Sequence, residues 1–506
     1  VAEEDTRLPQ TRVELFKRVC ILIWQEHDRD RTDLDLARLS DEQALSAAGA
    51  IAAGLLLAGG EAVSRASPAH LLDGDVHLAD LAGLPGAEAA ATIIASKLFV
   101  SVGTGRAKPI HRVIAEYLGA RWLARYATTP RAHRRLLAQL HGNGVPASLR
   151  GLHAWLAVHS PALAERVIAA DPYGVLRYGE TADLTPTQAD RLFEALCALA
   201  VDDPYFRGND WRSRTAAGLA VPALRGKIDA VIGSASSNAH LRSLVIQAVK
   251  GTPLAADVAA TLETIVLSGS RLYGEREDAA EALLPHRDRG WWRHAIATLR
   301  DQGTEDATRL ACRLIDLMDC EVSDDLLVST LFADMGVLVC PLPRGEGRHY
   351  VTRLRSYDWM MRKLPTERLP GVLDIVDEYT VLIEPEDWQS RREAADVAAH
   401  FMICLIDEDV VGAAQASSLW RWLGIIGRNE YRNQNRKSLT ELVDRLGARE
   451  DIRRAIQLHG FDDPRRGQVT WKMEIELRRR MVALSNRPAD TRSEERRVGK
   501  ECRSRW

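Results

Sequence analysis

The chain has 506 residues, of which 46% are hydrophobic and 27% are charged, and its formal net charge is -3. This length is enough for several domains, and the near balance of charge argues against nucleic acid as a partner of the whole chain. The seven cysteines form no C-x-x-C pair and show no zinc spacing, which favours buried thiols in a reducing cytosol over a zinc site or a disulfide framework.

The sequence has no feature of a membrane protein. The apolar stretch at residues 47–58 is too short to cross a bilayer, and no signal peptide is recognised. We therefore expect a cytoplasmic protein that makes no contact with a membrane.

Helix signals dominate from the start of the chain. A capping box at Thr11-x-x-Glu14 precedes apolar residues at helical spacing. A second box at Ser40-x-x-Gln43 opens a helix that we expect to end at the Gly59-Gly60 pair. Further boxes occur at Thr185-x-x-Gln188, Ser390-x-x-Glu393 and Ser438-x-x-Glu441.

Strand signal is nearly absent, with one exception. Residues 98–102 favour a strand, Gly103-Thr104-Gly105 follows as a turn, and residues 106–108 complete the one small β-hairpin that we predict. Pro109 fits the first position of the next helix, whose apolar face includes Tyr117. Helices, a hairpin and a further helix in this order are typical of a winged-helix domain, which we place at residues 41–127.

The second half of the chain has pairs of helical segments with short polar breaks. They recur at an irregular period of about 30 to 40 residues, which favours a HEAT-like α-solenoid at residues 211–340. We therefore predict a mainly α fold, in which a helical linker region at 128–210 joins the winged helix to this array. Residues 341–347 are expected to be a linker, and residues 341–491 a C-terminal helical domain whose tryptophans lie in the core.

The last fifteen residues, 492–506, differ from the rest because they contain six Arg or Lys and three Glu without an apolar stripe. They could be a solvated basic tail. One set of codons for this peptide contains the reverse complement of a common sequencing adaptor, so we interpret the segment as adaptor-encoded and non-native. Without it the formal net charge changes from -3 to -6. We expect the native frame to stop near Thr491 and, because the chain begins with Val1, its start to be cut as well.

Motifs for catalysis or metal binding are missing from the sequence. Residues 103–108 come nearest to a phosphate-binding G-x-x-x-x-G-K-[ST] loop, but they lack its spacing and its hydroxyl. Asp28 begins a run like a calcium loop, in which Asp33 and Leu39 do not fit the required Gly and Glu. The locally basic segment 428–466 favours a solvated helix face over a phosphate-binding patch. We predict no catalytic residue, no metal site and no cofactor held by this chain alone.

His111 is the residue to which the sequence points most directly. With Pro109 as the first helical residue, His111 falls in the first turn, where free backbone N–H groups and the macrodipole favour an anion. An imidazole there can donate to a phosphate oxygen, but spacing alone favours the simpler interpretation of a partly exposed polar residue. Arg112 is expected to pair with Glu116 at i, i+4 on the surface.

The string KPIHRVIAEYLGARWLA, residues 108–124, resembles the winged-helix segment of bacterial NACHT-type STAND ATPases. In that family an aromatic or aliphatic residue and His-Arg precede a helix that reads roughly x-x-x-E-[FY]-L-A-A-R-W-L. Here Gly119 replaces the first Ala, and Ile110 stands where an aromatic is common. Other segments are similar to the same proteins in the same order, within residues 11–330: 12–27, 40–57, 150–157 and 171–172.

The resemblance implies that residues 1–40 are the remnant of a NACHT helical domain, following an NTPase core that binds ATP or ADP with Mg. In the family, a His at the start of the last winged-helix-domain helix touches the diphosphate and helps to hold the closed, ADP-bound state. His111 matches that position, Arg112 is a weaker candidate for the same cofactor, and Pro9 a weak one for a nucleotide-contacting proline. Because this chain has no Walker motif, we expect it not to be an enzyme by itself.

The function that the resemblance implies is the regulatory and sensor portion of a signal-transduction ATPase in defence against phage. Its partners would be a protein ligand on the helical array, the NTPase domain, and further copies of the chain on activation. The alternative is a stand-alone HEAT-like scaffold that binds proteins without nucleotide. A winged-helix DNA binder is a third hypothesis, but the expected recognition helix at residues 84–97 offers only Lys97 as a basic side chain.

Overall fold

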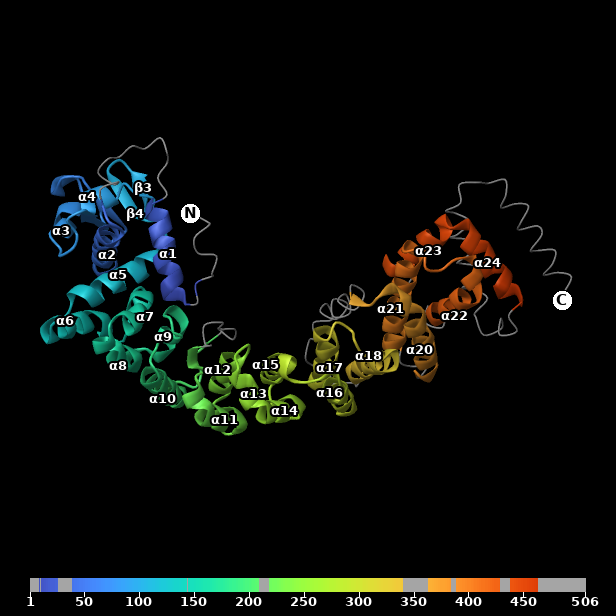
Figure 1. Cartoon of the computed structure of the whole chain (residues 1–506). Coiled ribbons are helices and arrows are strands. Elements are labelled where there is room, and N and C mark those ends of the chain that lie inside the picture. Colours follow the sequence, from blue (N-terminus) through green and yellow to red (C-terminus); the bar gives the residue numbers. More distant parts are fainter. Residues whose placement is uncertain are drawn as a thin grey trace. The chain divides into compact units, whose positions relative to one another are not determined.

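The computed structural model describes residues 9, 11–25, 39–142, 144–208, 218–339, 363–383, 388–427 and 437–462. These residues are mainly helical and contain one four-stranded sheet (Figure 1). The chain divides into two compact units, one of Val1–Val266 with Gly274–His286 and one of Leu267–Tyr273 with Arg287–Trp506. The predicted mainly α class is therefore confirmed.

The helices up to the division between the units are α1 (Arg12–Gln25), α2 (Asp41–Ala58), α3 (Leu78–Ala82), α4 (Ala90–Ile93), α5 (Arg112–Tyr126), α6 (Pro130–His141), α7 (Arg150–His159), α8 (Pro161–Ala170), α9 (Pro172–Tyr178), α10 (Pro186–Asp202), α11 (Arg225–Gly233), α12 (Ala239–Val249), α13 (Leu254–Asp257), α14 (Ala259–Leu267) and α15 (Tyr273–Leu283). Those that follow are α16 (Arg289–Asp301), α17 (Glu305–Leu317), α18 (Asp324–Val339), α20 (Leu369–Leu382), α21 (Trp388–Asp407), α22 (Ala416–Gly427), α23 (Lys437–Ala448) and α24 (Glu450–Asp462).

The sheet has the strand order β2-β1-β4-β3. Its strands are β1 (Ala62–Ser64), β2 (Asp75–His77), β3 (Phe99–Gly103) and β4 (Arg106–Pro109). The predicted hairpin is confirmed as the antiparallel pair β3–β4, and its turn uses the positive φ of Gly103 (142°) and Gly105 (67°). The expectation of a single hairpin is wrong, because β1 pairs antiparallel with β4 and parallel with β2. Strands of three residues are too short to show a period of two in the sequence.

Two helix expectations near the sheet are also wrong. Pro109 is the last residue of β4 rather than the first of a helix, a place that suits a residue without a backbone N–H. The expected recognition helix at residues 84–97 contains only the four-residue α4 and turns. Gly86, with φ of 75°, interrupts that segment before α4 begins.

The capping boxes succeed where the Ser or Thr precedes the helix. Ser40 and Thr185 cap α2 and α10 with both reciprocal hydrogen bonds, and Gly59 ends α2 in the left-handed conformation. The boxes at Ser390 and Ser438 are wrong as helix starts, since α21 begins at Trp388 and α23 at Lys437. The Ser438 hydroxyl instead donates to the buried Asp396 carboxylate, at 2.9 Å.

In the first unit, α5 packs against α2 on one side and α7 on the other, and glycines permit the close approach. A Cβ at Gly49 of α2 would lie 2.7 Å from the Leu118 carbonyl oxygen, and one at Gly119 would lie 3.2 Å from the Ala53 nitrogen. Leu152 and Trp155 of α7 are fully buried. The helix after the sheet thus shares its core with the helices on both sides of it.

From α10 onward, polar bridges join residues about one helix pair apart in sequence. Lys227 contacts Asp190, 37 residues earlier, and Thr261 donates to Asp229, 32 residues earlier. Gln247 donates to Asp278, 31 residues later. In the second unit, Gln302 donates to the Leu267 carbonyl, 35 residues earlier. These four separations lie between 31 and 37 residues, and the HEAT-like repeat itself stays a prediction.

The C-terminal helices continue to pack on their predecessors. Arg368, just before α20, donates to the carbonyls of Cys320 (2.7 Å) and Val322 (2.6 Å) and to the carboxylate of Asp324, so α20 starts against the turn between α17 and α18. Trp422 is buried and donates to Asp374 at 2.7 Å, which confirms the predicted core role for this tryptophan. The expected linker at residues 341–347 and tryptophans 359 and 471 lie outside the described residues.

Candidate functional site at the start of α5

His111 is the N-cap of α5. Its backbone is extended (φ -147°, ψ 139°), and its Nδ1 atom accepts the Val113 backbone N–H at 3.2 Å. The expected position inside the first turn is therefore wrong, because the helix begins three residues after Pro109. An accepting Nδ1 carries no proton, so the neutral ring carries its proton on Nε2. The residue is exposed, and the described part of the chain supplies no hydrogen-bond partner for Nε2.

Arg112 is exposed, and its guanidinium contacts two acceptors of the first unit. Its Nε donates to Glu116 Oε1 at 2.9 Å, and its Nη2 donates to the carbonyl oxygen of Ser148. The predicted pair with Glu116 is confirmed: its Arg112 side lies at the surface, as expected, whereas the Glu116 carboxylate is buried. The guanidinium therefore links α5 to the residues just before α7.

The Glu116 carboxylate lies at the first turn of α7. A Cβ at Gly151 would lie 2.0 Å from Glu116 Oε2, so the absence of a side chain there makes room for the carboxylate. Leu149, the N-cap of α7, provides no capping side chain, and a carboxylate near free helix N–H groups is stabilising. Burial raises the pKa of Glu116, while the Arg112 hydrogen bond and charge and then the His111 charge oppose that rise.

The next residue, Tyr117, joins three helices through its ring. Its centroid lies 5.5 Å from Phe16 of α1 and 5.2 Å from Trp155 of α7, which meet it tilted and edge-on. Arg12 covers this cluster with its guanidinium 5.3 Å from the Trp155 ring, and its Nη1 donates to the Gly179 carbonyl. No pattern in the sequence points to Arg12, because its partner carbonyl at Gly179 is 167 residues away.

Helix α7 also places histidines in the core. His153 is completely buried, with its Nε2 3.0 Å from His141 Nε2. Burial, followed by the charges of His141 and Arg150, lowers the pKa of His153 to about 3. Burial, followed by the Arg121 charge, lowers the pKa of His159 to about 4. Both rings are therefore neutral at physiological pH.

The remaining chemistry of the described residues is limited. No group of three or more His, Cys, Asp or Glu among them could hold a metal ion. The five described cysteines are free, and burial, opposed by the Arg121 charge, raises the pKa of Cys20 to about 12. The calcium-like run at residues 28–33 lies outside the described residues. Pro9 is described, but none of its contacts bears on nucleotide binding.

Comparison with known proteins does not identify a family. No family model, no curated protein and no solved structure matches the chain. None of the helices in the described ranges is long and apolar enough to cross a membrane. The resemblance of residues 108–124 therefore stands on the residues themselves.

Proposed function

We propose that this chain is the regulatory and sensor portion of a NACHT-type STAND signal-transduction ATPase, acting in defence against phage. The observation that carries the proposal is a difference in hydrogen bonding and packing among the residues of the string at 108–124. Arg112, Glu116 and Tyr117 of this string make contacts inside the unit, whereas His111 presents an Nε2–H outward with no partner in the described chain. Arg112 is exposed too, but its guanidinium already has partners, whereas the exposed His111 Nε2–H remains available for a ligand.

The chemistry of His111 fits the phosphate of ADP. The ring is held by the Val113 N–H, its outward atom is a donor, and it stands at a helix N-terminus, where an anion is favoured. ADP and Mg would be bound by the NTPase core, and a phosphate oxygen would supply the acceptor for the His111 Nε2–H. Arg112 would transmit rather than bind, because its guanidinium already connects Glu116 and Ser148.

The magnitude of this contact is sufficient for a switch. A charge-assisted hydrogen bond contributes about 1.5 to 3 kcal/mol, which shifts a closed-to-open ratio by about one to two decades. His111 would thereby couple the nucleotide state to the position of α5. From α5 the change would pass to α7 through Glu116, whose carboxylate lies against Gly151.

The helices that follow would form the sensor. Bridges between residues 31 to 37 apart, such as Gln247 to Asp278 and Lys227 to Asp190, support a HEAT-like array in which each helix pair contacts its neighbours. An extended array of this kind offers a long surface to a protein ligand. We propose that ligand binding there opens the closed state and permits self-association.

The test uses two substitutions in the intact ATPase. His111→Ala removes both the cap and the donor, whereas His111→Ser keeps a hydroxyl cap and removes only the donor. We expect both variants to lose co-purified ADP by about tenfold or more, in line with one lost charge-assisted hydrogen bond, and to raise basal signalling. ADP is measured by chromatography after denaturation. If His111→Ser retains ADP like the wild type, the residue is only a helix cap and the proposal fails.

A stand-alone HEAT-like scaffold is the second candidate function. The contacts between α1 and the aromatic cluster favour it, since Arg12 and Phe16 of α1 pack on Trp155 of α7. Genomic DNA upstream of the codon for Val1 discriminates the two. A G-x-x-x-x-G-K-[ST] motif in the same frame supports the ATPase, whereas a start codon at Val1 with a ribosome-binding sequence supports the scaffold.

A further inference from the structure

Helix α6 lies in a part of the chain with no acidic residue. Residues 117–164 contain six Arg and four His but no Asp or Glu. This charge asymmetry is hidden by the formal net charge of -3 for the whole chain. The structure shows where the arginines of this stretch are placed.

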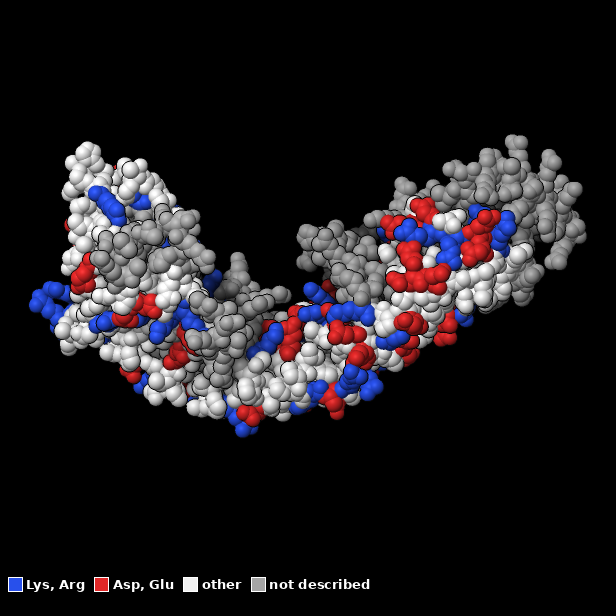
Figure 2. Space-filling view, turned by 45° about the horizontal axis from the view of Figure 1, so that its top comes forward, with Lys and Arg blue, Asp and Glu red and all other residues white. Residues whose placement is uncertain are grey.

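One face of α6 is buried and the other carries arginine. The residues His133, Leu136, Leu137 and Leu140 face the core. The residues Arg131, Arg134, Arg135, Ala138 and Gln139 are exposed on the other side. Figure 2 shows Lys and Arg side chains projecting at the left edge of the view, where α6 lies in Figure 1. We call Arg131, Arg134 and Arg135 the α6 arginine face.

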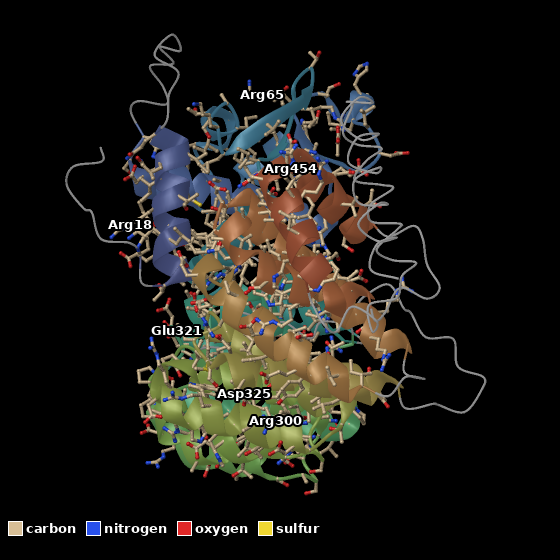
Figure 3. The ribbon with its side chains drawn as sticks, turned by 90° about the vertical axis from the view of Figure 1, so that its right-hand side faces the viewer. Arg18, Arg65, Arg300, Glu321, Asp325 and Arg454 are labelled. Carbon is tan, nitrogen blue, oxygen red and sulfur yellow. The ribbon has the colours of Figure 1, made fainter. Side chains whose placement is uncertain are left out.

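The α6 arginine face has no carboxylate partner among the described residues, in contrast to arginines elsewhere on the surface. Figure 3 labels three arginines that do have one, namely Arg18, Arg300 and Arg454. Their partners are Glu14 at 2.6 Å, Asp301 at 2.9 Å and Glu450 at 2.7 Å. Neutralisation by a neighbour is therefore common on these helices, and α6 departs from it.

The arrangement does not serve the stability of the helix. Arg131 lies three and four residues from Arg134 and Arg135, and like charges at these spacings destabilise a helix slightly. Arg131 also stands in the first turn, where the macrodipole disfavours a cation. Helix stability therefore does not account for the three arginines.

Positive charge continues beyond the end of α6. Burial and then the charge of Arg166, an exposed residue of α8, lower the pKa of His141, so Arg166 lies close to the last residue of α6. Arg125, at the other end, is already paired with Glu42. Among the arginines of this stretch, those without a carboxylate partner in the described residues are thus the three of α6.

The guanidinium groups and the lack of exposed large apolar residues on α6 select the partner. Arginine forks match phosphate oxygens, whereas a helix that lies in a membrane interface needs a large apolar face toward the lipid. We infer that the α6 arginine face binds the phosphate backbone of nucleic acid. This assignment departs from the expectation drawn from the overall charge, and it does not depend on His111 or on nucleotide.

The test measures binding of the full chain to a fluorescein-labelled 20-base-pair DNA duplex by anisotropy, from 50 to 200 mM NaCl. In the variant R131Q/R134Q/R135Q we expect weaker binding and a slope of log K against log salt that is less steep by about 2 to 3, since each lost phosphate contact removes about 0.9. Glutamine is a good helix former, and circular dichroism checks that the variant keeps its helices.

The matched control is R18Q/R300Q/R454Q, which removes the same number of positive charges from paired positions. It retains the same C-terminal segment 492–506, so a difference between the triple variants reports on α6. Retained affinity in the control with loss in the α6 variant supports the inference. Equal loss in both, or no binding to the duplex or to a 20-nucleotide single-stranded RNA at 50 mM NaCl, overturns it. Binding to phosphatidylserine vesicles without binding to either nucleic acid also overturns it.

Discussion

At the scale of single residues, the buried histidines of α7 make stability depend on pH. In the folded chain the pKa of His153 is lowered to about 3 and that of His159 to about 4, from an ordinary value of 6.5. Between these values the unfolded chain binds protons that the folded chain does not, so stability falls as the pH is lowered through 6.5. Each histidine removes about 2 kcal/mol on going from pH 8 to pH 5.

We therefore expect His153→Gln to lessen the loss of stability between pH 8 and pH 5. Urea unfolding at both pH values measures this difference. His70→Gln, at an exposed histidine, is the matched control and should leave the pH dependence as in the wild type. A His153→Gln variant whose pH dependence equals that of the control would show that His153 takes up a proton in the folded chain.

Residue identity predicted some contacts and missed others. The i, i+4 spacing of Arg112 and Glu116 was sufficient to predict their ion pair, because helix geometry brings such residues together. The burial of Glu116 was not predictable, since it depends on Gly151 of a different helix. The same applies to Arg12, whose partner carbonyl at Gly179 is 167 residues away.

At the scale of elements, glycine decides how closely α2 and α5 approach. A Cβ at Gly49 would lie 2.7 Å from the Leu118 carbonyl oxygen and 2.8 Å from Trp122 Cβ. We expect Gly49→Ala to destabilise the fold by about 1–3 kcal/mol, because the backbone of α5 must move and overpacking outweighs the gain in helix propensity. Urea unfolding of the variant measures the change.

Two other glycines provide the comparison. At Gly119 the nearest atoms to a Cβ are 3.1 to 3.3 Å away, so Gly119→Ala should cost less than Gly49→Ala. At Gly226 of α11 no atom lies within 4 Å, and Gly226→Ala should stabilise by up to about 1 kcal/mol. Equal effects at all three positions would contradict a role for close helix packing.

Whether a segment is a helix or a strand was predictable where the hydrophobic pattern extended over many residues. Amphipathic helices and the β3–β4 hairpin with its glycine turn appeared as expected. The short strands β1 and β2 escaped notice, because three residues contain too little periodicity. The capping box at Ser438 does not mark a helix start. Ser438 lies inside α23, and its hydroxyl donates to Asp396 of α21 instead of capping a helix.

At the scale of the whole molecule, we expect each buried contact to stabilise mainly the helices that it joins. Arg242 of α12 and Glu275 of α15 form an almost fully buried ion pair, with Nη2 and Oε1 2.8 Å apart. Removing one partner leaves an uncompensated buried charge, so we expect Arg242→Ala to cost about 3–5 kcal/mol. Hydrogen exchange should accelerate in α12 and α15 and remain unchanged in α20 to α22, because contacts in a helical array are made between neighbours.

A double substitution separates charge from packing at this pair. Arg242→Met with Glu275→Leu should recover most of the lost stability, since it removes both charges and keeps the volume. Arg191→Ala, which removes a partner from the exposed pair with Glu194, should cost less than about 1 kcal/mol. Accelerated exchange throughout the chain in Arg242→Ala would mean that the helices unfold as a single cooperative unit.

The sequence by itself determined the mainly helical class, the hairpin before α5, and the capping of α2 and α10. These properties depend on neighbours along the chain, whose geometry is set by the helix and the turn. Tertiary structure alone decided that His111 caps α5 and faces outward, that Glu116 is buried against Gly151, and that the arginines of α6 stand unpaired among the described residues. Burial and charge pairing depend on contacts between segments that are distant in the sequence, and the local pattern of residues does not predict these contacts.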